Sequence, residues 1–125
     1  MQKKIVFRHM DSTPAMEVYA NKQLRKVEAF LEKEQEPVRI ELILEPAKVH
    51  AHHRIELIVK SAQYDRVSSY EGPDFYDVLD RVIDVMYKEL HEDKRRRVDD
   101  LRKREKFSLE EEGIETDDFD GDYED

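Results

Sequence analysis

The two strings "PVRIELILEP" (residues 37–46) and "HHRIELIVK" (residues 52–60) alternate apolar and polar residues almost without a break. A period of two places apolar side chains on one face of a β-strand and polar side chains on the other. Only a short segment joins the two strings, which favours an antiparallel hairpin. The side chains that should face a core are Val38, Ile40, Leu42, Leu44, Ile55, Leu57 and Val59.

The segments around this hairpin predict the remaining elements. "KKIVFRH" (residues 3–9) is typical of a short strand, and "YDRVSSY" (residues 64–70) of a weaker one. Thr13 can cap a helix and Pro14 suits its first position, so a helix is expected over about residues 14–33. "EGPDFY" (residues 71–76) opens a second helix. The order predicts an α+β fold, a β-α-β-β-β-α sandwich whose four-stranded sheet carries two helices on one face.

The net charge of −9 is unevenly distributed along the 125 residues. Residues 105–125 hold eleven acidic residues and one lysine, a net charge of −10, so the rest of the chain is close to neutral. We therefore expect a folded domain over residues 1–104, with the second helix projecting to about 104, and a flexible acidic tail over residues 105–125. The sequence has no apolar run long enough for a membrane span and no signal peptide, which favours a cytoplasmic protein.

The sequence offers little for catalysis. It contains no cysteine and only three glycines, none of them in a phosphate-binding loop. His50, His52 and His53 have no partner at a recognised metal-ligand interval, and "DDFDGDYED" (residues 117–125) departs from a calcium loop in the place of its glycine. We expect no enzyme activity, no metal, no cofactor and no small-molecule substrate.

The basic stretch "YKELHEDKRRRVDDLRKREKF" (residues 87–107) admits two interpretations. Basic residues that recur at intervals of seven would form a cationic stripe about 30 Å long on one helix, and such a stripe suits the phosphates of a nucleic acid. The stripe comprises Arg81, Lys88, Arg95 and Arg102, widened by Arg96 and Arg97. Alternatively, the cations pair with acids four residues earlier and support a solvated helix. These pairs are Asp77–Arg81, Asp84–Lys88, Glu92–Arg96, Asp93–Arg97, Asp99–Lys103 and Asp100–Arg104.

Three strings carry a resemblance to a known family: "FRHMDSTPAMEVY" (residues 7–19), "RKVEAF" (residues 25–30) and "EGPDFYDVLDRVIDVMYKEL" (residues 71–90). In this order the chain resembles, over about residues 3–97, the family of ribosome hibernation-promoting factors and ribosome-associated inhibitors. The resemblance implies a domain similar to double-stranded-RNA-binding domains, lodged between the ribosomal subunits at the decoding region. There it would contact rRNA and block the tRNA and mRNA sites by occupation, as part of a stress response.

The resemblance also implies rRNA-binding residues. The family's basic positions on the two helices correspond to Lys26 and Lys88, and local charge adds Lys22, Arg25, Lys94, Arg95, Arg96 and Arg97. Val85 and Glu92 stand where the family usually has further cations, which favours a patch displaced toward residues 94–97. The chain ends before the C-terminal domain of long family members and resembles the inhibitor subgroup.

The acidic tail and the partner remain open on the sequence. The tail could select basic ribosomal proteins and reject free RNA, or it could only increase solubility. The leading function is ribosome binding and translation inhibition. The alternatives are an RNA-binding module for structured RNA away from the ribosome, and a protein-interaction domain that uses the second helix.

Overall fold

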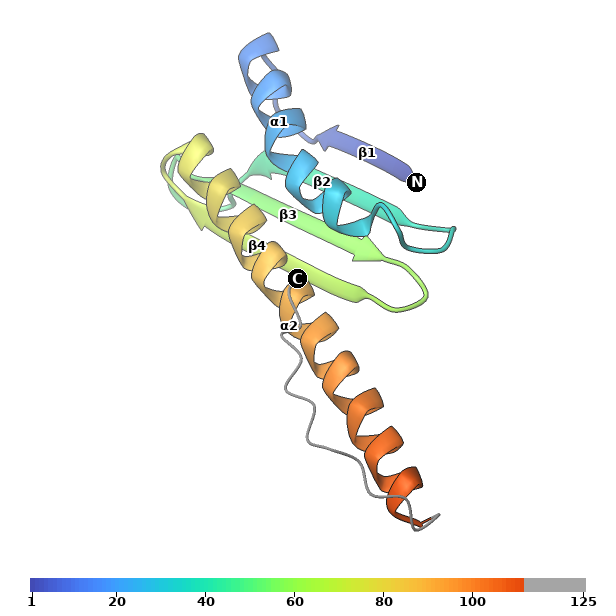
Figure 1. Ribbon diagram of the computed structural model, residues 1–125. Coiled ribbons are helices and arrows are strands. Elements are labelled where there is room, and N and C mark those ends of the chain that lie inside the picture. Colours follow the sequence, from blue (N-terminus) through green and yellow to red (C-terminus); the bar gives the residue numbers. More distant parts are fainter. Residues whose placement is uncertain (112–125) are drawn as a thin grey trace. The chain divides into compact units, whose positions relative to one another are not determined.

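The computed structural model describes residues 1–111, with side-chain surroundings up to residue 107. Its elements are β1 (Gln2–Phe7), α1 (Pro14–Leu31), β2 (Arg39–Pro46), β3 (His53–Lys60), β4 (Asp65–Gly72) and α2 (Phe75–Glu111). The order β-α-β-β-β-α is the one predicted (Figure 1). The chain divides into two units, Met1–Glu89 and Leu90–Asp125, and α2 begins in the first and continues in the second.

The first unit contains one four-stranded sheet in the order β1-β2-β3-β4. The hairpin predicted from residues 37–60 is confirmed, because β2 and β3 pair antiparallel with Leu42 opposite Leu57. β4 pairs antiparallel with β3, whereas β1 pairs parallel with β2. A parallel pair needs a long crossover connection, and α1 provides it. In the order β1-β2-β3-β4, β1 and β4 are the two edge strands.

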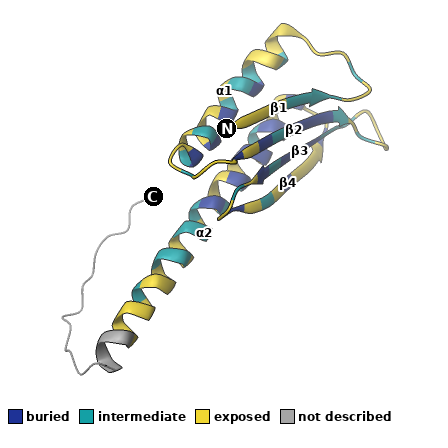
Figure 2. Ribbon diagram, turned by 90° about the vertical axis from the view of Figure 1, so that its right-hand side faces the viewer, coloured by how far each residue is buried: buried dark blue, intermediate teal, exposed yellow. Residues whose placement is uncertain are grey.

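The core lies on one face of the sheet, where α1 and the first part of α2 cover it (Figures 1 and 2). All seven apolar side chains predicted to face inward from β2 and β3 are buried, and the α1 stripe of Ala20, Leu24, Val27 and Leu31 packs on the same side. The predicted stripe of α2 is buried as well: Phe75, Leu79, Val82, Ile83, Met86 and Leu90. The opposite face of the sheet carries mainly charged side chains.

Capping residues set the starts of both helices. Thr13 accepts a hydrogen bond of 3.2 Å at Oγ1 from the backbone N–H of Met16, as expected of an N-cap. Asp74 does the same for α2, since its Oδ1 accepts from the N–H of Tyr76 at 2.9 Å and from that of Asp77 at 3.3 Å. Because Asp74 is the cap, α2 begins at Phe75, two residues after Pro73.

The second unit shows α2 extending further than expected. We predicted that the helix would reach about residue 104, but it ends at Glu111, so residues 105–111 are helical. Residues 99–107 are rich in Leu, Arg, Lys and Glu, which have high helix propensity, and their charge does not prevent a helix from forming. The predicted flexibility of residues 112–125 lies outside the described residues.

Candidate nucleic-acid interface

Three of the predicted rRNA-binding residues lie together on α1. Lys22, Arg25 and Lys26 are exposed on the side of the helix that faces away from the buried stripe. Among residues 1–111, none of the three forms an ion pair or a side-chain hydrogen bond. By contrast, Lys3 is held by Glu28 at 3.0 Å and by Asn21 at 3.0 Å. The charges of the three α1 cations are therefore available to an anionic partner.

A polar contact joins α1 to α2 beside these cations. Tyr19 Oη donates a hydrogen bond of 2.6 Å to Asp80 Oδ1, and Gln23 Nε2 donates one of the same length to the same oxygen. The Tyr19 ring also meets the Tyr76 ring edge-on, with centroids 4.9 Å apart. The hydrogen bond to Asp80, followed by burial and the negative charge of Asp80, raises the pKa of Tyr19 to about 12. This contact fixes the two helices relative to each other within the first unit.

Lys88 is the predicted α2 residue that lies in the first unit. Its side chain is exposed and forms no ion pair within the described residues, so the expected Asp84–Lys88 pair is not formed. Its neighbour Glu89 is engaged instead, because Arg66 of β4 lies 3.5 Å from its carboxylate. Lys88 is thus presented to solvent by a helix whose other side is attached to the sheet.

The remaining predicted residues lie in the second unit, which the structure describes separately from the first. Arg95 and Arg96 are exposed, and Lys94 and Arg97 are half-buried. Arg96 lies 3.4 Å from Glu92 and 3.9 Å from Asp93, so part of its charge is neutralised within the helix. Exposed pairs of this kind contribute about 1 kcal/mol or less, and phosphate can compete for Arg96.

The structure therefore supports self-pairing of α2 only in part. The Glu92–Arg96 pair is confirmed. In the described part of the chain, no ion pair joins Asp77 to Arg81, Asp84 to Lys88, Asp99 to Lys103 or Asp100 to Arg104. Such exposed pairs gain only a few tenths of a kcal/mol each, which is too little to hold long side chains in one geometry.

Arg81 shows which contact replaces one of these pairs. Its guanidinium lies over the ring of Tyr70 in β4, 5.2 Å from the ring centroid. A cation above an aromatic face is attracted by the electron-rich ring, and an arginine plane also stacks on it. This Tyr70–Arg81 contact, like the Tyr19–Asp80 hydrogen bond, was not predicted from the sequence. Both join residues of α2 to another element of the fold, α1 in one case and β4 in the other, and no local pattern indicates them.

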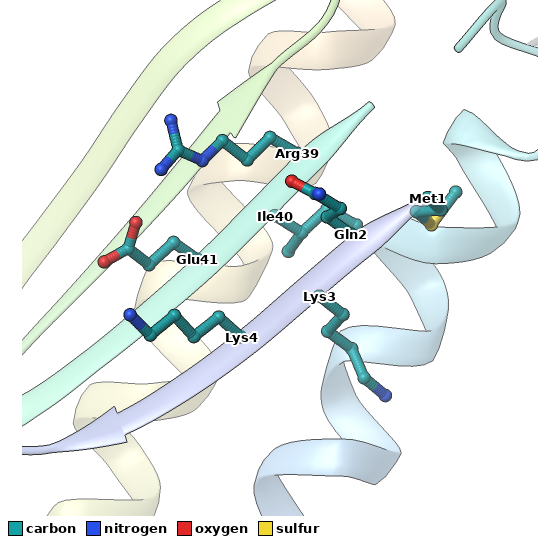
Figure 3. A pocket seen from close by; sticks show the side chains of 7 residues that line it. All are labelled: Met1, Gln2, Lys3, Lys4, Arg39, Ile40 and Glu41. Atoms are coloured by element: carbon teal, nitrogen blue, oxygen red, sulfur yellow. The ribbon is translucent and has the colours of Figure 1, made fainter. Parts of the chain in front are cut away.

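A shallow cavity of about 480 Å³ lies where β1 and β2 begin. It is lined by Met1, Gln2, Lys3, Lys4, Arg39, Ile40 and Glu41. Figure 3 shows Lys4, Arg39 and Glu41 projecting to one side of the sheet and Lys3 to the other. Lys3, Lys4 and Arg39 outnumber Glu41 among its charged side chains, but Lys3 is already held by Glu28.

The histidines do not gather a metal-binding set in the described part of the chain. The rings of His50 and His52 lie 5.3 Å apart, and His53 contacts the ring of Phe75 at 5.7 Å. Within residues 1–111, no group of three His, Asp or Glu side chains could hold a metal ion. The weak calcium-loop pattern of residues 117–125 lies outside the described residues. No helix among the described residues has the length and hydropathy of a membrane span.

The eight predicted rRNA-binding residues fall within a region that matches a family model. The model, described as "Sigma 54 modulation protein / S30EA ribosomal protein", matches residues 4–98. The chain belongs to this family. The resemblance indicated by the three sequence strings is confirmed at this level. No curated protein gives a significant match to the chain.

Two solved structures share the fold. The N-terminal domain of Protein Y from Thermus thermophilus is 22% identical with a TM-score of 0.57, over 72% of this chain and 96% of that one. A ribosomal subunit interface protein from Coxiella burnetii is 18% identical with a TM-score of 0.57, over 75% of this chain and 98% of that one. At such identities the likeness establishes the architecture of this member of the S30EA family, and not its contacts.

Proposed function

We propose that this chain is a cytoplasmic ribosome-binding factor that inhibits translation by occupation and has no catalytic role. It binds rRNA at the decoding region between the subunits and blocks the tRNA and mRNA sites. The observation that carries the proposal is the family match over residues 4–98, because this region contains α1, the first two-thirds or so of α2 and all eight predicted cations. The name of the Coxiella burnetii neighbour, a ribosomal subunit interface protein, supports the ribosome as partner.

The charges of the helices support RNA as the ligand. Lys22, Arg25, Lys26 and Lys88 are exposed and without ion pairs in the described residues, so no internal contact must be broken before they meet phosphate. Each phosphate that such a cation neutralises adds about 0.7–0.9 to the slope of log affinity against log salt. Lys94, Arg95, Arg96 and Arg97 are further cations of the second unit, and they already take part in contacts there, as Arg96 does with Glu92.

Co-sedimentation with purified ribosomes at graded salt tests the proposal. The chain should migrate with ribosomes in stoichiometric amounts and dissociate steeply as salt increases. Lys26→Glu or Lys88→Glu should weaken binding and lower the salt slope. Lys48→Glu changes the charge equally at an exposed residue outside both helices, and it should bind like the wild type.

Three results would count against the proposal in different ways. Equal affinity for free structured RNA and for ribosomes would favour an RNA-binding module away from the ribosome. Ribosome binding that resists every helix substitution would favour a protein-interaction domain. Full binding without inhibition of translation in vitro would refute occupation of the tRNA and mRNA sites.

A further inference from the structure

Tyr70 and Arg81 form an exposed aromatic and cationic pair at the edge of the sheet. Tyr70 lies on the edge strand β4, opposite Ile55 of β3. Although it is on the face that the helices cover, Tyr70 keeps 45% of its surface exposed. Arg81 of α2 is also exposed and lies over the ring at 5.2 Å. The ring therefore meets solvent beside a planar cation.

The surroundings hold this pair in place. The hydroxyl of Ser68 is buried and donates a hydrogen bond of 3.0 Å to the carbonyl of Val82, next to Arg81. Two residues earlier in β4, Arg66 reaches Glu89 at 3.5 Å. β4 is thus attached to α2 at two points, and one of them is directly next to the position where Tyr70 meets Arg81. A rigid platform loses little entropy when a ligand stacks on it.

The charge around the pair disfavours a phosphate group as its direct ligand. Between residues 75 and 89, α2 carries four carboxylates and only two cations, Arg81 and Lys88. Asp77 and Asp84 lie one turn from Arg81 on either side and would repel a phosphate placed there. An uncharged planar group avoids this repulsion and can stack on both the phenol ring and the guanidinium.

We propose that Tyr70 and Arg81 form a stacking site for an unpaired nucleobase of RNA. Bases that leave a helix stack on aromatic rings and on arginine planes. Such contacts contribute binding free energy in addition to that of the phosphate contacts. Lys88 lies two turns along α2, about 10 Å away on nearly the same side, where it can receive the phosphate of a neighbouring nucleotide. The site rests on the proposed RNA-binding function and narrows it to a single-stranded segment with at least one splayed base.

Binding of a fluorescently labelled, unstructured RNA hexamer, followed by anisotropy, tests the site. Tyr70→Ala should weaken binding at least about fivefold, because stacking on one aromatic side chain contributes about 1–3 kcal/mol per base. Tyr70→Phe keeps the ring and should bind like the wild type. Val67→Ala is the matched control, since Val67 is 52% exposed on the same strand but points to the other face of the sheet.

An abasic ribose-phosphate hexamer separates base contacts from phosphate contacts. Wild type and Tyr70→Ala should bind this hexamer equally, and the salt slope for the RNA hexamer should be the same for both. Arg81→Lys keeps the charge but loses the plane, so it should weaken binding to the RNA hexamer only. Addition of the RNA hexamer should also shift the NMR signals of the Tyr70 ring through the ring current of the stacked base.

Two outcomes would overturn the site: equal RNA affinity of Tyr70→Ala and wild type, or an equal loss with the abasic hexamer. Circular dichroism of each variant identifies any loss caused by misfolding, and Tyr70→Leu, which keeps an apolar side chain without a π-system, then replaces Tyr70→Ala. Failure of the proposed function would be detected in a different experiment, the co-sedimentation with ribosomes. The RNA hexamer could bind in a Tyr70-dependent way while the protein fails to co-sediment with ribosomes. That result would refute ribosome binding and leave the stacking site intact.

Discussion

Substitution of Tyr19 by Phe removes the hydroxyl that joins α1 to α2 and leaves the ring in place. That hydroxyl donates a hydrogen bond of 2.6 Å to the Asp80 carboxylate. Hydrogen bonds to charged groups contribute about 1.5–3 kcal/mol. Tyr19 is only half-buried, so water screens part of this interaction. We expect Tyr19→Phe to lower the free energy of unfolding by about 1 kcal/mol at neutral pH.

The same hydrogen bond predicts how this difference depends on pH. The bond to Asp80, together with burial and the Asp80 charge, raises the pKa of Tyr19 from 10.0 to about 12. A rise of this size corresponds to at most about 2.7 kcal/mol between the two protonation states before screening. Because the folded state holds the proton more tightly, the stabilisation is complete below pH 10 and is lost as the pH rises through 12.

Urea unfolding followed by circular dichroism, at several values of pH, measures this difference. Alkaline effects that the wild type and Tyr19→Phe share cancel when the two proteins are compared. Tyr70→Phe is the control, because the Tyr70 hydroxyl makes no hydrogen bond within the described residues. Combination with Asp80→Asn should give a coupling energy of at least about 0.5 kcal/mol. Equal stability of the two proteins at neutral pH, or an unchanged difference at strongly alkaline pH, would refute the reasoning.

Three further predictions concern the start of α2 and the tail. Gly72→Ala would place a Cβ 2.9 Å from Val78 Cγ2, so it should destabilise the fold by about 1–3 kcal/mol in urea unfolding, and Val78→Ala should relieve the loss. Asp74→Ala removes the N-cap and should cost about 1 kcal/mol, whereas Asp74→Ser should keep most of the stability; equal urea midpoints would contradict the cap. Deletion of residues 107–125 should raise the affinity for free RNA more than the affinity for ribosomes in parallel binding assays, and an unchanged ratio would rule out a selective tail.

The candidate interface was predictable from the sequence only in its composition. The positions of Lys22, Lys26 and Lys88 on exposed helix faces follow from helical periodicity and the resemblance. Whether each cation is paired with an acid could not be predicted in the same way. The favourable spacing predicted six pairs, but exposed pairs gain so little free energy that spacing alone does not decide the partner. Arg81, for example, lies four residues after Asp77 and contacts Tyr70 instead.

Much of the architecture is encoded in short segments of this chain. Alternation in residues 37–60, the cap at Thr13 and the apolar stripes of the helices are properties of short segments, and each was sufficient to predict its element. The contacts of Tyr19 with Asp80 and of Tyr70 with Arg81 were decided only by the tertiary structure. The partners of each pair lie on different elements, and only the packing of the helices on one face of the sheet brings them within reach.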